Sequence, residues 1–233
     1  MWLVVGLGNP GAQYAHHRHN VGFMAIDELA RREDCAPFRS KFSAQLSRCR
    51  LSKGGDDALL LKPQTFMNLS GDSVQPCAAF FKVPSERIIV VHDDLDLPFG
   101  EVRLKKGGGH GGHNGLRSLM QRLGGGDFIR IRCGIGRPPA TFRGPVADFV
   151  LSNYNSDERS KLSECLSTVA KTVLDIAARG LPAAMKSRNT RTKKKRPKPP
   201  PQHADVSKVE KKGASSLLAL ATRRGQRPGG EDQ

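Results

Sequence analysis

The chain opens with Trp2-Leu3-Val4-Val5-Gly6-Leu7-Gly8-Asn9-Pro10-Gly11, an apolar run that stops at a cluster of glycines. A short apolar run closed by glycine is typical of a buried strand followed by a turn. The glycines also match the fingerprint of dinucleotide-binding proteins, but that fingerprint requires a helix that opens on them. Here Asn9-Pro10 predicts a turn, and no acid follows a second strand at the usual distance. We therefore expect a buried first strand and no nicotinamide cofactor.

The rest of the chain alternates between strand-like and helix-like segments. Short apolar or alternating runs predict strands at residues 58–62, 87–91, 101–106 and 128–134. Apolar residues at helical spacing predict helices at residues 21–32, 73–81, 114–123 and 157–178. This order predicts a single α/β domain with a mixed, largely parallel twisted sheet flanked by helices. Ligands of such sheets bind beyond the carboxyl ends of the strands.

Charge separates the C-terminal part of the chain from the rest. The 233 residues carry a net charge of +16, and the segment from Lys186 onward holds 14 Lys or Arg against 4 Asp or Glu. Its lysine block and proline run cannot form a core, so we expect a domain at residues 1–188 and a disordered basic tail at 189–233. The charge favours a polyanionic partner, so the tail is either a solvated extension without a partner or a tether to RNA or the ribosome.

Several classes of protein are excluded by the composition. No apolar run approaches the ~20 residues of a membrane helix, and the N-terminus lacks a secretory pattern, so we expect a cytoplasmic protein without membrane contact. The five cysteines are odd in number and contain no CxxC pair. They predict reduced, mostly buried thiols rather than a disulfide framework or a zinc ribbon.

Three polar segments follow predicted strands and contain residues suited to catalysis. His16-His17-Arg18-His19-Asn20 supplies three histidines after the first strand. Lys62-Pro63-Gln64-Thr65-Phe66-Met67-Asn68-Leu69-Ser70-Gly71 describes a loop whose Asn68 offers both a donor and an acceptor. His92-Asp93-Asp94-Leu95-Asp96 ends a strand, and a carboxylate there could fix the tautomer of a histidine.

A fourth polar segment, Lys105-Lys106-Gly107-Gly108-Gly109-His110-Gly111-Gly112-His113-Asn114-Gly115, is rich in glycine. Its open backbone N–H groups and two lysines are typical of a phosphate cradle. A metal site remains an alternative, with ligands His92, Asp93, Asp94, His110 and His113.

Taken together, these segments closely resemble bacterial-type peptidyl-tRNA hydrolases, in order and in spacing, from residue 1 to about residue 188. The resemblance implies a monomeric α/β enzyme that needs no metal or other cofactor. It also implies hydrolysis of the ester between a peptide and the 3′ ribose of tRNA, which recycles prematurely released peptidyl-tRNA. The basic tail lies outside the resemblance.

The resemblance also implies a role for individual residues. His19 would be the general base that activates water, and Asp93 would hold its tautomer. Asn68 and Asn114 would position substrate and water or stabilise the oxyanion, and Asn9 would recognise the blocked amino group. Four further residues would contact the tRNA, namely Tyr14 and Phe66 at its 3′ end and Lys105 and Arg132 at its phosphates, with Arg130 as an equal candidate for the last role.

One alternative lies within the resemblance itself, because the family has plant relatives that assist intron splicing without catalysis. The presence of His19, Asp93, Asn68 and Asn114 favours catalysis over a non-catalytic RNA-binding role.

Overall fold

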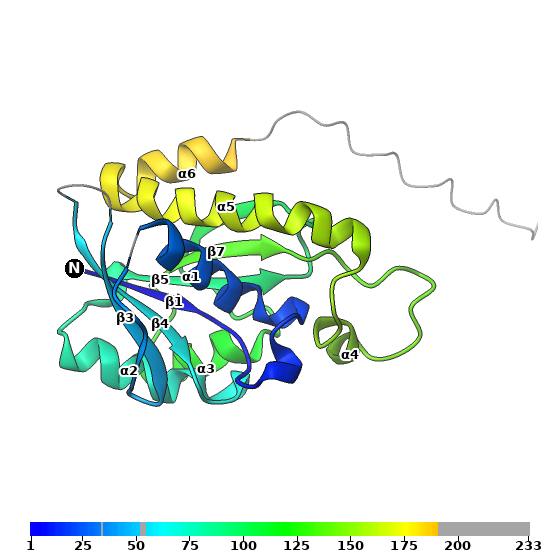
Figure 1. The fold of residues 1–233 in the computed structure, drawn as a ribbon, viewed down its shortest axis with the longest axis horizontal. Coiled ribbons are helices and arrows are strands. Elements are labelled where there is room, and N and C mark those ends of the chain that lie inside the picture. The colour runs from blue at the N-terminus through cyan, green and yellow to red at the C-terminus, as the bar shows by residue number, and fades with distance from the viewer. Residues whose placement is uncertain (34, 52–54, 191–233) are drawn as a thin grey trace, which may run out of the picture. The chain divides into compact units, whose positions relative to one another are not determined.

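Seven strands form one sheet in the order β2-β3-β4-β1-β5-β7-β6 (Figure 1). This computed structural model describes residues 1–33, 35–51 and 55–190. The strands are β1 (Trp2–Gly6), β2 (Arg39–Lys41), β3 (Ala44–Arg50), β4 (Asp57–Pro63), β5 (Ile88–Asp94), β6 (Val102–Lys106) and β7 (Ile129–Gly134). The pairs β1–β4, β1–β5 and β5–β7 are parallel, and the pairs β2–β3, β3–β4 and β6–β7 are antiparallel. The predicted α/β class and mixed sheet are thus confirmed, with the parallel strands at the centre.

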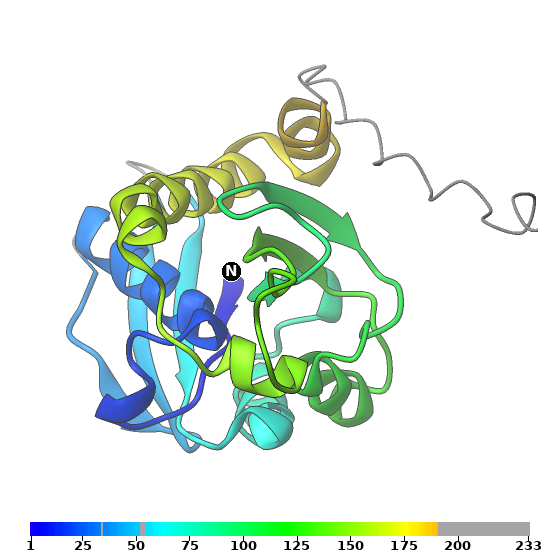
Figure 2. The same ribbon diagram turned by 90° about the vertical axis from the view of Figure 1, so that its right-hand side faces the viewer.

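Helices cover both faces of the sheet. They are α1 (Val21–Arg32), α2 (Ser70–Phe80), α3 (Asn114–Leu123), α4 (Val146–Val150), α5 (Ser156–Arg179) and α6 (Leu181–Asn189). Helices α1, α5 and α6 pack on one face, and α2 and α3 pack on the other, as both views show (Figures 1 and 2). Because strand side chains alternate, Val4 of β1 packs into the core between the sheet and helices α1, α5 and α6. Leu3 and Val5 pack into the core on the other face, under α2 and α3.

Two glycines bring the start of α1 onto the carboxyl ends of β1 and β5. A Cβ atom on Gly22 would collide with the backbone of Leu7 and with the carbonyl oxygen of Val91, and one on Gly6 would collide with the carbonyl oxygen of Gly22. Only glycine permits this approach of helix to strand. It places the turn before α1, which carries His19, beside the end of β5.

The hairpin β2–β3 was not predicted from the sequence. Its turn consists of Phe42 and Ser43, which both have positive φ values, of 57° and 50°. Tight hairpin turns of this kind usually carry Asn and Gly, so the usual composition signal was missing. Because this hairpin pairs antiparallel to β4, the sheet is less parallel than expected.

The described residues up to Thr190 form one compact unit. The disordered tail predicted at residues 189–233 lies outside the described residues, apart from its first two positions. Those two were assigned to the tail, yet Asn189 is the last residue of α6. Its side-chain amide hydrogen-bonds to both the N–H and the C=O of Leu104 on the edge strand β6.

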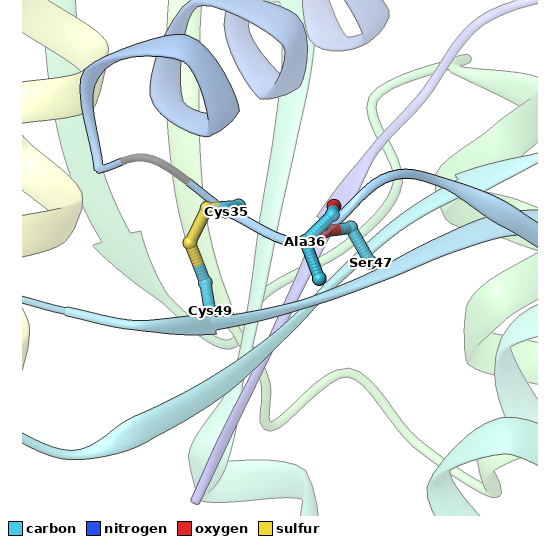
Figure 3. Close-up of a disulfide and its surroundings, with 4 residues drawn as sticks. All are labelled: Cys35, Ala36, Ser47 and Cys49. Atoms are coloured by element: carbon cyan, nitrogen blue, oxygen red, sulfur yellow. A yellow bond between two sulfur atoms is a disulfide. The ribbon is translucent and has the colours of Figure 1, made fainter.

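The prediction for the cysteines was wrong at one pair. Cys35 and Cys49 form a disulfide between the segment after α1 and strand β3 (Figure 3), with Cα atoms 4.6 Å apart. Beside it, Ala36 donates its N–H to Arg48 O, and its C=O accepts from Ser47 Oγ at 2.5 Å. The spacing of the two cysteines carried no recognisable motif, because the missed hairpin brings them together. The other three cysteines are free and buried, as predicted.

No helix among the described residues has the length and apolar character that crossing a lipid bilayer requires.

Candidate active site

A cavity of about 520 Å³ opens beyond the carboxyl ends of β5 and β7. Its lining includes five residues that were singled out in the sequence: His19, Asp93, Lys105, Asn114 and Arg132. Helix α4 supplies one apolar wall through Val146, Ala147 and Val150. The cavity therefore combines titratable groups, cationic groups and an apolar surface, in the part of an α/β sheet where ligands bind.

Asp93 is the centre of the hydrogen-bond network in this cavity. It lies at the end of β5, and its side chain is 4% exposed. Its Oδ1 atom is 2.8 Å from His19 Nδ1 and 3.0 Å from His113 Nε2. Burial by itself raises the pKa of Asp93, but the two histidines outweigh this and hold the pKa well below 3.8. Asp93 is therefore an anion that accepts from two imidazoles.

Hydrogen bonds fix the tautomers of both histidines. The Nδ1 atom of His113 accepts from the backbone N–H groups of Gly115 and Leu116 at the start of α3, so its Nε2 carries the proton that goes to Asp93. His19 donates from Nδ1 to the same carboxylate, which leaves its Nε2 unprotonated. That nitrogen can accept a proton from a water molecule in the cavity.

The pKa of His19 is set by two opposing effects. Burial lowers it, but the charge of Asp93 and the hydrogen bond to it outweigh burial, so the pKa lies above 6.5. A general base works best when its pKa is close to the working pH. The charge of Asp93 and the hydrogen bond to it thus make the free Nε2 of His19 a stronger proton acceptor than burial alone would allow.

The other histidines of these segments have different surroundings. His16 is exposed, and His17 forms a β-bridge with Asn153. His92 is buried and donates from Nδ1 to the backbone oxygen of Asp93 at 2.7 Å, and burial followed by the charge of His113 lowers its pKa to about 3. Among the three histidines of residues 16–19, geometry therefore selects His19.

The histidine-bearing turn is held in place by Arg18, a residue with no assigned role in the sequence reasoning. Its buried guanidinium donates to Ser152 Oγ and Asn153 O, forms an ion pair with Glu158 at 2.5 Å and stacks on the ring of Phe149. Phe149 belongs to α4, and Glu158 to the first turn of α5. Arg18 thus joins the turn that carries His19 to the opposite wall of the cavity.

Asn9 links the first loop to the loop after β4. Its backbone and the side chain of Asn20 exchange two hydrogen bonds of 2.9 Å, and its Oδ1 accepts from the N–H of Met67 at 2.8 Å. Because Oδ1 is engaged, the Nδ2 group is the part of Asn9 that can serve a ligand. Phe66 and Asn68, on either side of Met67, are both exposed, and Phe66 is 57% exposed.

The predicted tRNA contacts differ in their availability. Lys105 is exposed, and Arg132 is partly exposed and paired with Asp94 at 2.7 Å. Arg130, the equal candidate, is 2% exposed, and its guanidinium donates to the carbonyl oxygens of Gly108, Gly109 and Gly126. Arg130 is therefore committed to holding the glycine-rich loop, which favours Arg132 as the residue that could meet a phosphate.

The structure does not bring every predicted residue to the same cavity. Asn9, Tyr14, Phe66 and Asn68 lie outside its lining, and Tyr14 rests against the ring of His17. These residues belong to the loops after β1 and β4, which are joined by the bond between Asn9 and Met67. A substrate that reached all of them would extend beyond the cavity.

The geometry also bears on two other kinds of site considered from the sequence, a dinucleotide site and a metal site. The first α-helix begins at Val21 and not at the glycine cluster, which removes the basis of a dinucleotide site. Of the five suggested metal ligands, His92 is directed to a backbone oxygen and Asp94 to Arg132. Ligand atoms do converge on His19, Asp93 and His113, within 4.8 Å of one another. The distances and tautomers in this group are those expected when His19 and His113 each donate an N–H to the carboxylate of Asp93.

Comparison with known proteins agrees with this arrangement. The family model described as peptidyl-tRNA hydrolase matches residues 3–197. The chain belongs to the peptidyl-tRNA hydrolase family. A protein of that name from Sorangium cellulosum is 60% identical over 193 residues, which cover 83% of this chain and 86% of the relative. Another from Geobacter metallireducens is 50% identical over 189 residues, which cover 81% and 95%.

Solved structures of peptidyl-tRNA hydrolase have the same fold. The crystal structure of the enzyme from Acinetobacter baumannii matches with a TM-score of 0.73 and 38% identity, over 82% of this chain and 95% of that one. Membership of the peptidyl-tRNA hydrolase family, expected from the sequence motifs, is thus confirmed.

Sequence reasoning missed the role of one residue in the network. His113 was noted only within the glycine-rich loop and as a possible metal ligand, whereas it caps α3 and donates to Asp93. Its position directly before a predicted helix was a usable signal, because side chains there often accept backbone hydrogen bonds.

Proposed function

We propose that this chain hydrolyses the ester between a peptide and the 3′ ribose of tRNA, with His19 as the general base. The observation that carries the proposal is the bond from His19 Nδ1 to Asp93, which leaves Nε2 unprotonated at the cavity. His19 Nε2 takes a proton from water as the water oxygen attacks the ester carbonyl. The ester C–O bond then breaks, and the departing ribose oxygen takes the proton from His19.

The remaining residues would assist this reaction by binding and by charge stabilisation. Side-chain amides of Asn68 and Asn114 would donate to the carbonyl oxygen as it gains charge, and Nδ2 of Asn9 would bind the peptide part of the substrate. Tyr14 and Phe66 would contact the 3′ end of the tRNA. Lys105 and Arg132, which both line the cavity, would meet its phosphates.

The partner and the compartment follow from this reaction. The substrate is peptidyl-tRNA, and all of the proposed groups belong to one chain, which suits a monomer acting in the cytoplasm. Through its basic tail the chain would also contact RNA or the ribosome, since Lys and Arg there outnumber acids.

The decisive experiment is release of the acyl group from N-acetyl-aminoacyl-tRNA, with unblocked aminoacyl-tRNA alongside and EDTA present. We expect the wild-type chain to cleave the blocked substrate only. The His19→Ala variant should lose at least about 100-fold in kcat/KM, which is the usual worth of a general base. The matched control is His16→Ala, which removes an exposed histidine three positions away and should retain full activity.

Failure would take recognisable forms. Equal activity of His19→Ala and the wild-type chain would overturn His19 as the base, and loss of activity in EDTA would favour a metal-dependent reaction. If the wild-type chain bound tRNA without cleaving it, a non-catalytic RNA-binding role would replace the proposed hydrolysis.

A further inference from the structure

Both chain neighbours of His19 are held by other parts of the fold. On one side, the side chain of Asn20 and the backbone of Asn9 exchange two hydrogen bonds of 2.9 Å. On the other side, Arg18 is only 5% exposed, although a guanidinium is always charged. The 2.8 Å bond from His19 to Asp93 forms between these two anchored positions. The place of the base therefore depends on what holds its neighbours.

The anchor on the Arg18 side is the segment that runs from α4 into α5. The backbone N–H of Arg18 donates to Ser152 O at 3.1 Å. Its Nη1 donates to Ser152 Oγ at 2.6 Å and to Asn153 O at 2.5 Å, and its Nη2 donates to Glu158 Oε2 at 2.5 Å. Its Cζ lies over the ring of Phe149, 4.5 Å from the centroid. One side chain thus contacts the end of α4, the turn that follows and the start of α5.

Glu158 connects this anchor to the first turn of α5. Its Oε2 also accepts from the N–H of Asn155 at 2.8 Å, and the Oδ1 of Asn155 accepts from the N–H of Glu158 at 2.8 Å. This reciprocal pair is the capping box that begins α5. The same carboxylate oxygen therefore fixes both the helix start and the guanidinium of Arg18.

The anchoring segment also forms a wall of the catalytic cavity. The wall residues of α4 are Val146, Ala147 and Val150. Phe149, on which Arg18 stacks, belongs to the same five-residue helix. A contact that fixes Phe149 therefore also fixes the wall, and Arg18 relates the position of this wall to that of the base.

The contacts of Arg18 require the shape of arginine. A guanidinium donates in several directions within one plane and stacks on an aromatic ring, whereas a lysine ammonium is a point charge on a flexible stem. The side chains of Arg18 and Glu158 are 7% and 16% exposed. Removal of one partner from such a buried pair leaves the other charge without compensation. The two side chains should therefore act as a unit.

We infer that Arg18 is a positioning residue, which with Glu158 sets His19 against the α4 wall and keeps its Nδ1 on Asp93. This inference rests on the proposed function, which makes His19 the base. Arg18 is absent from the cavity lining, so it acts through its neighbour and not on the substrate. Its effect can still be large, because a displacement of about 1 Å in a reacting group can lower a rate about 100-fold.

The test compares four variants of the full chain: Arg18→Gln, Arg18→Lys, Glu158→Gln and the double variant Arg18→Gln/Glu158→Gln. The matched control is Arg31→Gln, which removes an exposed arginine of α1 that is paired with Glu28. Activity is measured as kcat and KM on N-acetyl-aminoacyl-tRNA, and folding as the urea midpoint. Nitrogen NMR of the histidine rings reports which ring nitrogen carries the proton.

We expect Arg18→Gln to lower kcat by about 10–100-fold. Its KM should stay within about threefold of wild type, because the cations that would meet the tRNA belong to β6 and β7. Arg18→Lys should fall between the two, since it keeps the charge but not the planar fork. The double variant should lose no more than Arg18→Gln alone, because the pair acts as a unit.

The NMR spectrum tests position directly. A neutral imidazole that loses its bond to Asp93 can carry its proton on either nitrogen. In Arg18→Gln the share of His19 protonated on Nε2 should therefore rise. His113 is the internal control, because the N–H groups of Gly115 and Leu116 fix its tautomer independently of Arg18.

Three results would overturn the inference: a wild-type kcat in Arg18→Gln, an unchanged His19 tautomer in that variant, or an equal change at His19 and His113, which would mean general loosening. If Arg18→Gln does not fold, Glu158→Gln decides, because its amide oxygen can still accept from Asn155 and preserve the cap. An unchanged His19 signal in that variant would then reject the role of the pair. The NMR comparison needs no substrate, so it holds even if the wild-type chain cleaves no peptidyl-tRNA and the proposed function fails.

Discussion

The carboxylate of Asp93 determines both the tautomer and the basicity of His19, so its removal has a predictable pH signature. Because Asp93 raises the pKa of His19, the acid limb of kcat/KM in the wild-type chain should lie above pH 6.5. In Asp93→Asn the charge is lost while burial remains, so the limb should move to lower pH. The plateau should fall by about 10²–10⁴-fold, since the amide no longer favours the reactive tautomer.

The measurement is a pH profile of kcat/KM on blocked aminoacyl-tRNA. Asp56→Asn serves as the control, because Asp56 is exposed, pairs with exposed Arg87 and does not line the cavity. An acid limb that stays in place in Asp93→Asn would show that another group sets it.

At the scale of single elements, His113 joins the start of α3 to the carboxylate. His113→Ala removes the cap and one donor to Asp93, so the free energy of unfolding should fall by about 2–3 kcal/mol. His113→Asn can still accept from the N–H groups of Gly115 and Leu116 and should recover about 1 kcal/mol. Urea unfolding measures both, with His16→Ala as a control expected within about 0.5 kcal/mol of wild type, because His16 is exposed. Equal losses in the two His113 variants would rule out the capping role.

The disulfide between Cys35 and Cys49 ties the end of α1 to strand β3. The bonded cysteines lie 14 positions apart, and closing a loop of this size contributes about 3 kcal/mol in the chain-entropy account. Dithiothreitol should therefore lower the Tm of the wild-type chain. In Cys35→Ser the Tm should already be lower and should not respond to the reductant. A wild-type Tm that is indifferent to dithiothreitol would mean that the two thiols are unpaired in solution.

At the scale of the whole molecule, the limit of the folded unit can be located by truncation. A chain that ends at Thr190 keeps α6 and the pairing of Asn189 with β6, so its urea midpoint should equal that of the full chain. A chain that ends at Arg188, the domain limit expected from composition, loses these hydrogen bonds and should unfold at lower urea. Each lost bond contributes about 1 kcal/mol. Equal midpoints for the two truncated chains would show that Asn189 adds no stability.

Much of this architecture could be predicted from the sequence because local patterns and tertiary packing agree. The helices at 21–32 and 114–123 have the predicted limits, since their apolar stripes face a core and Gly124 ends the second in a left-handed conformation. The hairpin β2–β3 could not be recognised, because Phe42 and Ser43 adopt a turn that such residues seldom form.

The site could be predicted only in part. Motif positions selected His19 and Asp93, whose contact the structure then provides at 2.8 Å. The second donor to Asp93 depends on where α3 begins in space, and the engagement of Arg130 depends on the fold of the glycine-rich loop. No local pattern encodes such distances.

The bond between Asn189 and Leu104 has a consequence for how copies of this chain behave at high concentration. An uncovered sheet edge presents free N–H and C=O groups that a second molecule can pair with. On β6, the amide of Asn189 occupies one such pair of groups. The opposite edge, β2, is only three residues long and carries exposed Arg39 and Lys41. Both ends of the sheet are thus poor templates for further strands, and the fold resists aggregation where open sheets are most vulnerable.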